Sequence, residues 1–248
     1  MNKLSVVLIG AAMTLAHGAQ AAELRVLAGG AMTVVWAEVK PKFEQASGHK
    51  LDIFFGTTPN LIKEATSGKP FDVGIVPVEV TQDTAARAKF AAGPTVDVAR
   101  VGLGVAVRAG AGKPNISTPD TLKAALMNAK SIATLPASAA GAQVMKVFER
   151  LGVSDAIKGK LQAKGAPAEI VQAVANGEAE LGVFLLNVLT APGLDVVGPF
   201  PADLQQEIVF TAAPASETKE GDAAKALIAY LKSPVVIPII KAKGMTPG

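Results

Sequence analysis

The apolar positions along the chain follow two patterns that alternate from segment to segment: recurrence at helical spacing and short continuous runs. Between short apolar runs, apolar residues recur at helical spacing, as at Val35, Val39 and Phe43. Short continuous apolar runs flanked by turn residues are typical of buried parallel strands. Such runs occupy residues 24–28, 51–55, 71–76, 101–108, 132–135, 181–185 and 207–213. The alternation predicts an α/β protein with mixed, mostly parallel sheets flanked by helices.

Glycine, proline and hydroxyl-bearing residues mark the expected helix ends. Gly48 is expected to close a helix over residues 32–46. Thr58 followed by Pro59 fits a helix N-cap with proline at the first helical position. Thr118 begins a second segment of the same pattern. These signals divide the apolar pattern into separate helices and strands.

Two of the predicted strands are expected to cross between two lobes. Residues 101–108 form a nearly continuous run of apolar residues and glycine, and residues 207–213 return the chain to the first lobe. The predicted first lobe combines residues 22–101 with residues 209–248. The second covers residues 102–208, and we expect a ligand cleft between the two lobes.

The N-terminal 21 residues have the organisation of a secretion signal. Lys3 precedes an apolar run over residues 4–16, and Ala19-Gln20-Ala21 forms a small-x-small cleavage site. The run is too short to span a bilayer, and no later segment of the sequence is long and apolar enough. We therefore expect a periplasmic protein without membrane insertion that begins near Ala22. The alternative is an uncleaved N-terminal anchor.

Composition excludes several classes of chemistry. The chain has no Cys and two His, of which His17 lies in the predicted signal and His49 in a predicted turn. A thiolate, a histidine triad and a histidine metal cluster are therefore excluded, and we expect neither cofactor nor metal. The formal net charge of +3 is scattered and aromatics are 4% of residues, which argues against nucleic-acid binding. No aromatic or Met-rich stripe indicates a partner subunit, so we expect a monomer.

Small and hydroxyl-bearing residues follow the first two predicted strands. These residues are Gly29-Gly30-Ala31 after one strand and Gly56-Thr57-Thr58 after the next. Loops of this kind place backbone N–H groups and helix N-termini at one sheet edge, where an anion can be held. Individually, Thr58 is also explained as a helix cap and Gly29-Gly30 as a tight turn. Their shared placement is what predicts a small anionic ligand.

Four polar residues at later strand ends are further candidates. Ser138 and Asn187 follow strands of the second lobe, Arg108 ends the crossing strand, and Glu79 follows the third strand. Ser138 is equally explained as a loop serine, and Arg108 as a solvent-facing residue. A hinge or surface position is the alternative for Glu79. Hydroxyls and backbone amides can hold an oxyanion without a counter-charge.

Several segments together resemble the periplasmic molybdate-binding proteins of ABC importers, within the type II periplasmic binding protein superfamily. The resemblance covers essentially the whole chain after the predicted signal. Its segments are residues 24–32, 43–48, 55–61, 68–73, 139–141, 179–183, 229–234 and 244–247. It implies a two-lobed type II periplasmic binding protein fold, a small anionic ligand and an ABC permease as a partner.

The sequence departs from that family at two expected ligand positions. A serine of the first loop is replaced by Ala31, and a tyrosine of the second lobe by Leu185. Thr57 or Thr58 keeps the hydroxyl of the second loop, and Ala140 matches the alanine that offers its backbone amide. Two missing hydroxyl donors would leave molybdate oxygens unpaired, at about 1–3 kcal/mol each. Molybdate specificity therefore does not follow, and a larger organic anion such as a carboxylate fits better.

The leading hypothesis is a solute-binding protein that closes two lobes on a small anion for an ABC importer. The alternative is an enzyme on the same scaffold, since some secreted relatives are similar to aconitate isomerase, which needs no cofactor for allylic proton transfer. In that case Glu79 or a water held by Thr57 is the candidate base, and Arg108 or backbone amides hold carboxylates. A ligand-presenting sensor is a third possibility. The predicted ligand-binding residues are Gly30, Ala31, Met32, Thr57, Thr58, Glu79, Arg108, Ser138, Ala140, Gly141, Leu185 and Asn187.

Overall fold

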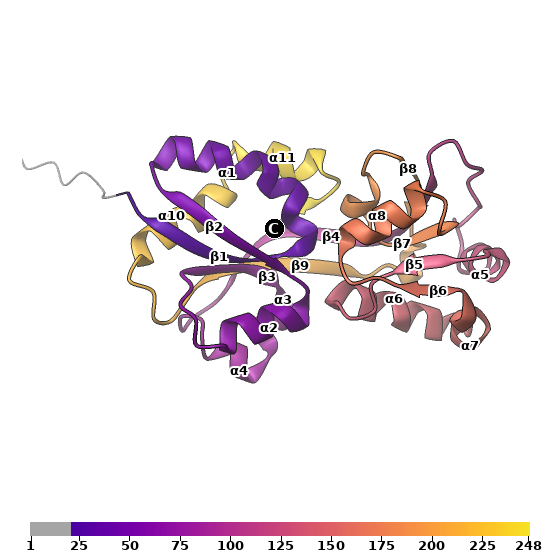
Figure 1. The fold of residues 1–248 in the computed structure, drawn as a ribbon, viewed down its shortest axis with the longest axis horizontal. Coiled ribbons are helices and arrows are strands. Elements are labelled where there is room, and N and C mark those ends of the chain that lie inside the picture. The colour runs from indigo at the N-terminus through magenta and orange to yellow at the C-terminus, as the bar shows by residue number, and fades with distance from the viewer. Residues whose placement is uncertain (1–20) are drawn as a thin grey trace, which may run out of the picture.

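The protein is a two-lobed α/β molecule whose lobes lie side by side along its longest axis (Figure 1). The structure is a computed structural model and describes residues 21–248. The predicted signal peptide, apart from Ala21, lies outside the described residues. Within these residues no single helix has the length and apolar composition to cross a bilayer; two C-terminal helices pass that test only together, across a 56° bend.

The first lobe is a sheet with helices on both faces (Figure 1). Its strand order is β2 (Lys50–Gly56), β1 (Glu23–Gly29), β3 (Val73–Pro77), β9 (Glu207–Pro214) and β4 (Val96–Arg108), with β10 (Thr246–Pro247) beside β4. β1 pairs in parallel with β2 and β3, whereas β9 is antiparallel to β3 and β4. One face is covered by α1 (Thr33–Ser47), α10 (Gly221–Leu231) and α11 (Val236–Ala242). The other carries α2 (Thr58–Thr66), α3 (Val78–Gln82) and α4 (Thr84–Arg87).

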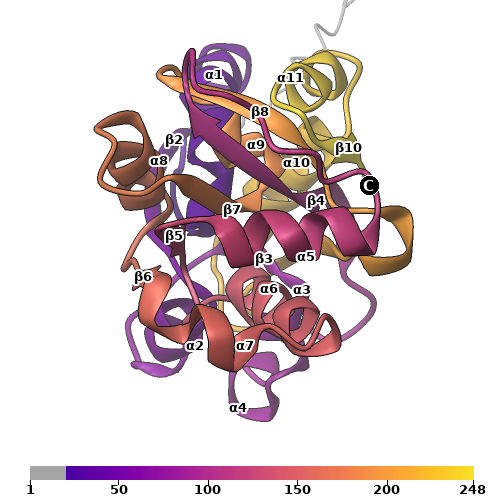
Figure 2. The same ribbon diagram turned by 90° about the vertical axis from the view of Figure 1, so that its right-hand side faces the viewer.

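The second lobe repeats this layering on a smaller sheet. Its strands are β7 (Leu181–Leu185), β5 (Ile132–Thr134), β6 (Leu161–Ala163) and β8 (Leu194–Pro199). β5 is parallel to β6 and β7, and both β7 and β8 are antiparallel to β4. The helices are α5 (Pro119–Asn128), α6 (Ala139–Arg150), α7 (Ser154–Ile157), α8 (Pro167–Ala175) and α9 (Leu186–Leu189). Figure 2, an end view, shows α6 and α8 on opposite sides of β5 and β7.

Most of the predicted element boundaries are confirmed. Gly48 ends α1 in the left-handed conformation at φ 76°, which glycine adopts without a steric penalty. Thr118 caps α5 with a reciprocal capping box. The prediction that Thr58 is an N-cap is wrong: Thr57 holds that position and Thr58 is the first helical residue. Strand β8, over Leu194–Pro199, has no counterpart in the sequence-based assignment, because six residues after a Pro-Gly turn give too short a pattern.

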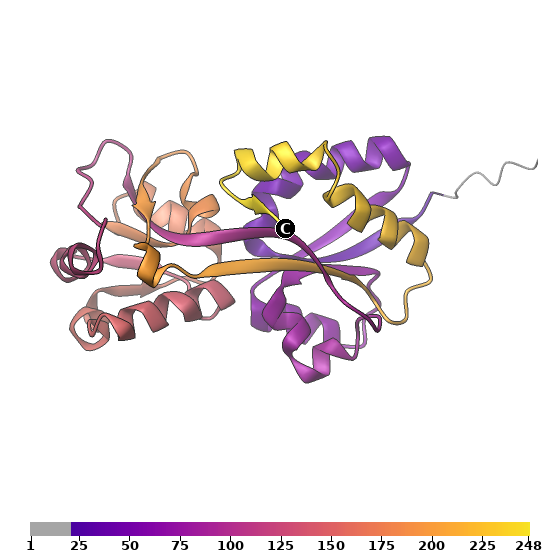
Figure 3. The same cartoon turned by 180° about the vertical axis from the view of Figure 1, so that it is seen from behind.

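Two long strands, β4 and β9, connect the lobes. From behind, β4 and β9 run side by side (Figure 3). β4 pairs with β9 up to Gly102 and with β7 from Leu103 onward, so its partners change next to the predicted lobe boundary. Buried residues on both sides of this change, Val101 and Val105, belong to one core cluster. The core is therefore continuous from one lobe to the other.

A side-chain amide completes the backbone pairing where β4 changes partners. Gln205 Oε1 accepts a hydrogen bond from Leu103 N at 2.7 Å, and Gln205 Nε2 donates to Leu103 O at 2.9 Å. Leu103 O also accepts from Phe200 N at 3.0 Å. Gln205 therefore supplies the hydrogen bond that a neighbouring strand would otherwise make at the crossover.

Removal of this amide is expected to destabilise the crossover. In Gln205→Ala the buried N–H of Leu103 loses its acceptor, which costs about 1–3 kcal/mol of unfolding free energy. Chemical denaturation followed by circular dichroism measures the change. Gln206→Ala removes a neighbouring amide that makes no side-chain hydrogen bond to the described residues, so its midpoint is expected to stay near wild type. Equal midpoints for the two variants would contradict this role.

Candidate ligand-binding cleft

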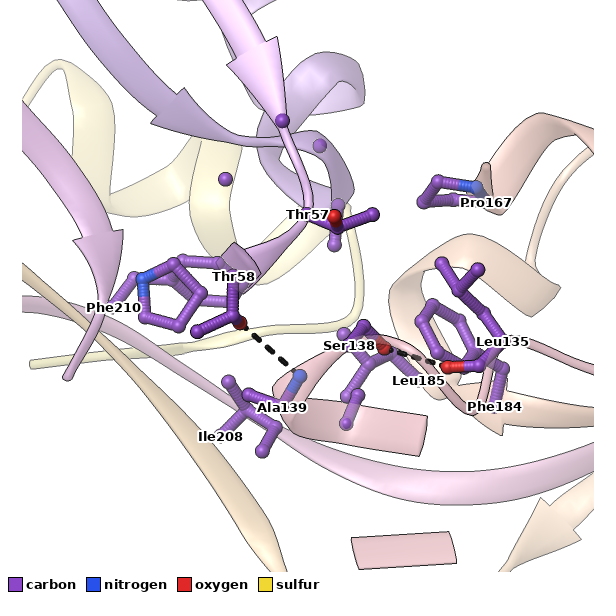
Figure 4. Close-up of a pocket in the computed structure, with 16 residues that line it drawn as sticks. Thr57, Thr58, Leu135, Ser138, Ala139, Pro167, Phe184, Leu185, Ile208 and Phe210 are labelled. Carbon is purple, nitrogen blue, oxygen red and sulfur yellow. Dashed lines mark hydrogen bonds between the residues drawn. The ribbon is translucent and has the colours of Figure 1, made fainter. Parts of the chain in front are cut away.

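Loops from the two lobes enclose a small inner cavity of about 30 Å³ (Figure 4). The first lobe contributes the ends of β1, β2 and β3 and the crossing strand β9. The second contributes the β5–α6 loop, the end of β7 and the start of α8. The lining residues are Gly29, Gly30, Ala31, Gly56, Thr57, Thr58, Pro77, Leu135, Ser138, Ala139, Ala140, Pro167, Phe184, Leu185, Ile208 and Phe210.

A larger outer groove of about 500 Å³ adjoins the inner cavity. Five residues line both spaces, so the two lie next to each other. The shared residues are Gly30, Ala31, Gly56, Thr57 and Pro167. The rest of the groove is formed by Thr33, Val34, Phe55, Asn60, Gly165, Ala166, Ala168, Val171, Gln172, Val188 and Ala191.

Two hydrogen bonds join the lobes beside the inner cavity. Ala139 N of the second lobe donates to Thr58 Oγ1 of the first at 3.1 Å (Figure 4). Asn187 Nδ2 donates to the backbone oxygen of Ala31 at 2.7 Å. Thr58 and Asn187 are both buried, at 9% and 1% exposure. The structure therefore describes a closed arrangement of the lobes.

The start of α6 presents a free N–H group to the cavity. The first N–H groups of a helix cannot bond within it. Here Ala139 N is bonded by Thr58, and Gly141 N donates to the capping Ser138 Oγ at 3.0 Å. The N–H of Ala140, which lines the cavity, has no acceptor among residues 21–248. An anion at this point would gain both a hydrogen bond and a favourable interaction with the helix dipole.

The opposite wall of the cavity offers a free hydroxyl. Thr57 lines both the inner cavity and the outer groove, and its Oγ1 makes no hydrogen bond to another described residue. Figure 4 shows this side chain between the start of α2 and Pro167. A hydroxyl and backbone N–H groups can together replace the water shell of an oxyanion.

No residue that lines either space is ionisable. Within residues 21–248, no group of three His, Asp or Glu side chains is placed to hold a metal ion. Any charge on a bound ligand is therefore met by dipoles of backbone and side-chain groups.

The structure brings seven of the predicted residues together around the inner cavity. They are Gly30, Ala31, Thr57, Thr58, Ser138, Ala140 and Leu185. Met32 is fully buried in the core and does not line it. Gly141 packs against the backbone of Leu135, because a Cβ at this position would overlap the backbone oxygen of Leu135. Asn187 joins the lobes through Ala31.

Arg108 and Glu79 lie outside the lining of the cleft. Arg108 is exposed at the far end of β4, and its Nη1 lies 3.4 Å from where a Cβ of Gly177 would be. β4 continues past the cleft for several residues before it ends at Arg108. A position at the end of this strand is therefore not a position in the cleft. Glu79 lies in α3, two residues after Pro77, and its Oε2 is buried without a hydrogen-bond partner among the described residues.

Several lining residues have no polar chemistry that sequence reasoning could recognise. Pro167 begins α8 and faces Gly30 across the cleft, with ring carbons 3.7 Å from the position of a Cβ there. Ile208 and Phe210 project from the crossing strand β9. A helix-starting proline is a sequence signal for a helix, not for a cleft.

A cleft between two lobes that are joined by crossing strands is typical of two-lobed solute-binding proteins. The model of the bacterial extracellular solute-binding protein family matches residues 24–246, and the chain belongs to that family. The sequence-based resemblance is thereby confirmed at the level of family and fold.

Curated relatives cover nearly the whole chain. An aconitate isomerase from Pseudomonas sp. is 35% identical, over 90% of this chain and 87% of the relative. The molybdate-binding protein ModA of Azotobacter vinelandii is 32% identical, over 96% and 95%. The relatives thus include both a binding protein and an enzyme.

Solved structures show the same fold at low identity. The Azotobacter vinelandii periplasmic molybdate-binding protein superposes with a TM-score of 0.76 at 20% identity, over 90% of this chain and 98% of that one. The sulfate-binding protein SubI from Mycobacterium tuberculosis gives 0.72 at 17% identity, over 91% and 87%. These similarities establish the two-lobed architecture.

Loss of the Thr58 hydroxyl is expected to favour the open form. Thr58→Val keeps the shape of the side chain but removes the acceptor of Ala139 N, which is worth about 1 kcal/mol. The ratio of open to closed molecules should rise about fivefold. Small-angle X-ray scattering would detect this as a larger radius of gyration. Thr66→Val, which removes a hydroxyl from the exposed end of α2, is the matched control and should leave the scattering unchanged.

Proposed function

We propose that this protein captures a small anion, an oxyanion or an organic carboxylate, between its lobes and delivers it to an ABC importer. The free Ala140 N–H and the free Thr57 hydroxyl, facing one cavity without charged residues, support anion binding most directly. Closing the lobes brings these donors together, since Thr57 belongs to the first lobe and Ala140 to the second. The ligand would thus be held by both lobes at once.

Delivery to a membrane permease is supported by the family. Extracellular solute-binding proteins are the family of this chain, and molybdate-binding and sulfate-binding proteins are among its relatives and structural neighbours. We propose a periplasmic location after cleavage near Ala22, and a monomer as the working form. Neighbouring genes for a permease and an ATPase would support transport over a sensor.

The ligand need not be molybdate. Ala31 and Leu185 both line the inner cavity, and neither offers a hydroxyl. These are the positions at which the molybdate-binding proteins are expected to have serine and tyrosine. The identity of the anion is therefore best found by a panel of molybdate, tungstate, sulfate, phosphate and carboxylates, read as thermal stabilisation of the native state.

Thr57→Val is expected to weaken binding of whichever anion stabilises the wild type. A hydrogen bond to a charged group is worth about 1.5–3 kcal/mol, so affinity should fall about ten- to a hundredfold in isothermal titration calorimetry. Thr57→Ser keeps the hydroxyl and should bind within about threefold of wild type. Unchanged affinity in Thr57→Val would remove this residue from the proposed site.

The affinity is also expected to be nearly independent of pH. No ionisable side chain lines the cleft, so an anion that keeps one charge state, such as sulfate, should bind within about twofold from about pH 6 to about pH 9. Calorimetric titrations at several pH values measure this. A bell-shaped or stepwise profile would mean that a titrating side chain contacts the ligand.

A second candidate is an isomerase that interconverts cis- and trans-aconitate. The 35% identity to an aconitate isomerase over 90% of the chain favours it. The reaction moves a proton between allylic carbons: a base removes it from one carbon and it returns to the other. Thr57 could hold a water for this step, whereas Glu79 would have to reach the cleft from α3. Incubation of trans-aconitate with a high concentration of protein tests this candidate, and the absence of cis-aconitate by chromatography would eliminate it.

A further inference from the structure

We propose that the ligand is an organic anion with one anionic head, held in the inner cavity, and an uncharged, largely apolar body in the outer groove. This inference rests on the proposed capture of an anion and specifies its chemical class. It follows from three properties of the cleft: the size of its two spaces, the apolar lining of the outer one, and the lack of a cationic side chain in that lining.

The inner cavity is too small for a whole organic ligand. A space of this kind needs about 10–15 Å³ for each water, so about 30 Å³ holds roughly two waters or one compact polar group. The residues that carry the free donors, Ala140 and Thr57, line this space. A carboxylate or similar head fits it, and the remainder of the ligand would extend past Gly30 and Pro167, which line both spaces, into the outer groove.

The outer groove has the size and lining of a pocket for an organic body. Its volume of about 500 Å³ lies within the range of small-molecule sites, about 300–1,000 Å³. Among residues 21–248 four large hydrophobic side chains are exposed, and two of them, Val34 and Phe55, line this groove at 37% exposure each. Val171 and Val188 extend the apolar surface. A hydrocarbon part placed here would cover these side chains and gain free energy from their burial.

No cationic side chain lines the groove to pair with a second anionic group. Its polar side chains are neutral and include Asn60 and Gln172. At the rim, Glu169 Oε2 accepts a hydrogen bond from the backbone N of the lining residue Gly165 at 2.9 Å, and Lys164 precedes Gly165 in the chain, so charges of both signs lie near the rim. A second carboxylate placed here would lose hydration without a cationic partner, so a dicarboxylate is disfavoured relative to a monocarboxylate of the same length.

A series of straight-chain carboxylates tests the proposal directly. Each methylene moved out of water is worth a factor of about four in affinity, so hexanoate should bind at least about tenfold tighter than butanoate. Adipate, which has the same length as hexanoate and a second carboxylate, should bind at least tenfold more weakly than hexanoate. Hexanamide, which lacks the anionic head, should not bind measurably. Isothermal titration calorimetry of the mature full chain gives all four values.

A charged variant in the groove distinguishes electrostatic selectivity from nonspecific hydrophobic binding. Val34→Lys places a positive charge in the groove at an already exposed position, and should raise the affinity for adipate at least fivefold relative to hexanoate. Val235→Lys is the matched control, because Val235 is also an exposed valine, at 51%, and lies outside the cleft lining. It should leave the ratio unchanged.

The outcomes distinguish this inference from the proposed function. Binding of sulfate or molybdate without a gain from butanoate to hexanoate would keep anion capture and overturn the organic ligand. Tighter binding of adipate or trans-aconitate than of hexanoate to the wild type would overturn the single anionic head. Failure of every inorganic and organic anion to bind would overturn the proposed function itself, and the inference with it.

Discussion

The first N–H groups of a helix have no acceptor within the helix, and this constraint organises the cleft. At the start of α6 the structure satisfies them in three different ways. Ser138 caps the N–H of Gly141, Thr58 of the other lobe accepts from Ala139, and the N–H of Ala140 remains for a ligand. One helix start therefore caps its own backbone, bonds to the other lobe and leaves one N–H group without an acceptor at the cavity.

The same constraint explains how a cleft without charged residues can suit an anion. A buried ion pair would have to overcome a large desolvation cost, whereas oriented N–H dipoles are already in place when the ligand arrives. The donors face one another only in the closed form, because Thr57 and Ala140 are carried by different lobes. A ligand that contacts both therefore shifts the equilibrium towards closure.

The crossing strands give this closure its geometry. β4 belongs to the core of both lobes, so packing holds the connection between the lobes in place. The ladder changes partner at one position, Leu103, where the side chain of Gln205 bonds to the backbone. The two hydrogen bonds between the lobes contribute about 1 kcal/mol each, a small amount that thermal motion can overcome. Such a balance suits a protein that must both capture and release its ligand.

The sequence by itself determined the family, the two-lobed α/β fold and the strand-end loops at Gly30 and Thr57, because these depend on local periodicity and on turn residues close together in the chain. It also indicated Ser138 and Ala140 at the start of α6. The tertiary structure alone decided that Thr58 bonds across the lobes instead of capping α2, since its partner Ala139 is 81 residues away. It likewise placed Arg108 outside the cleft and brought Val34 and Phe55 into the groove. Apolar side chains look alike in sequence whether they face the core or a ligand, and only the packing of distant segments separates the two.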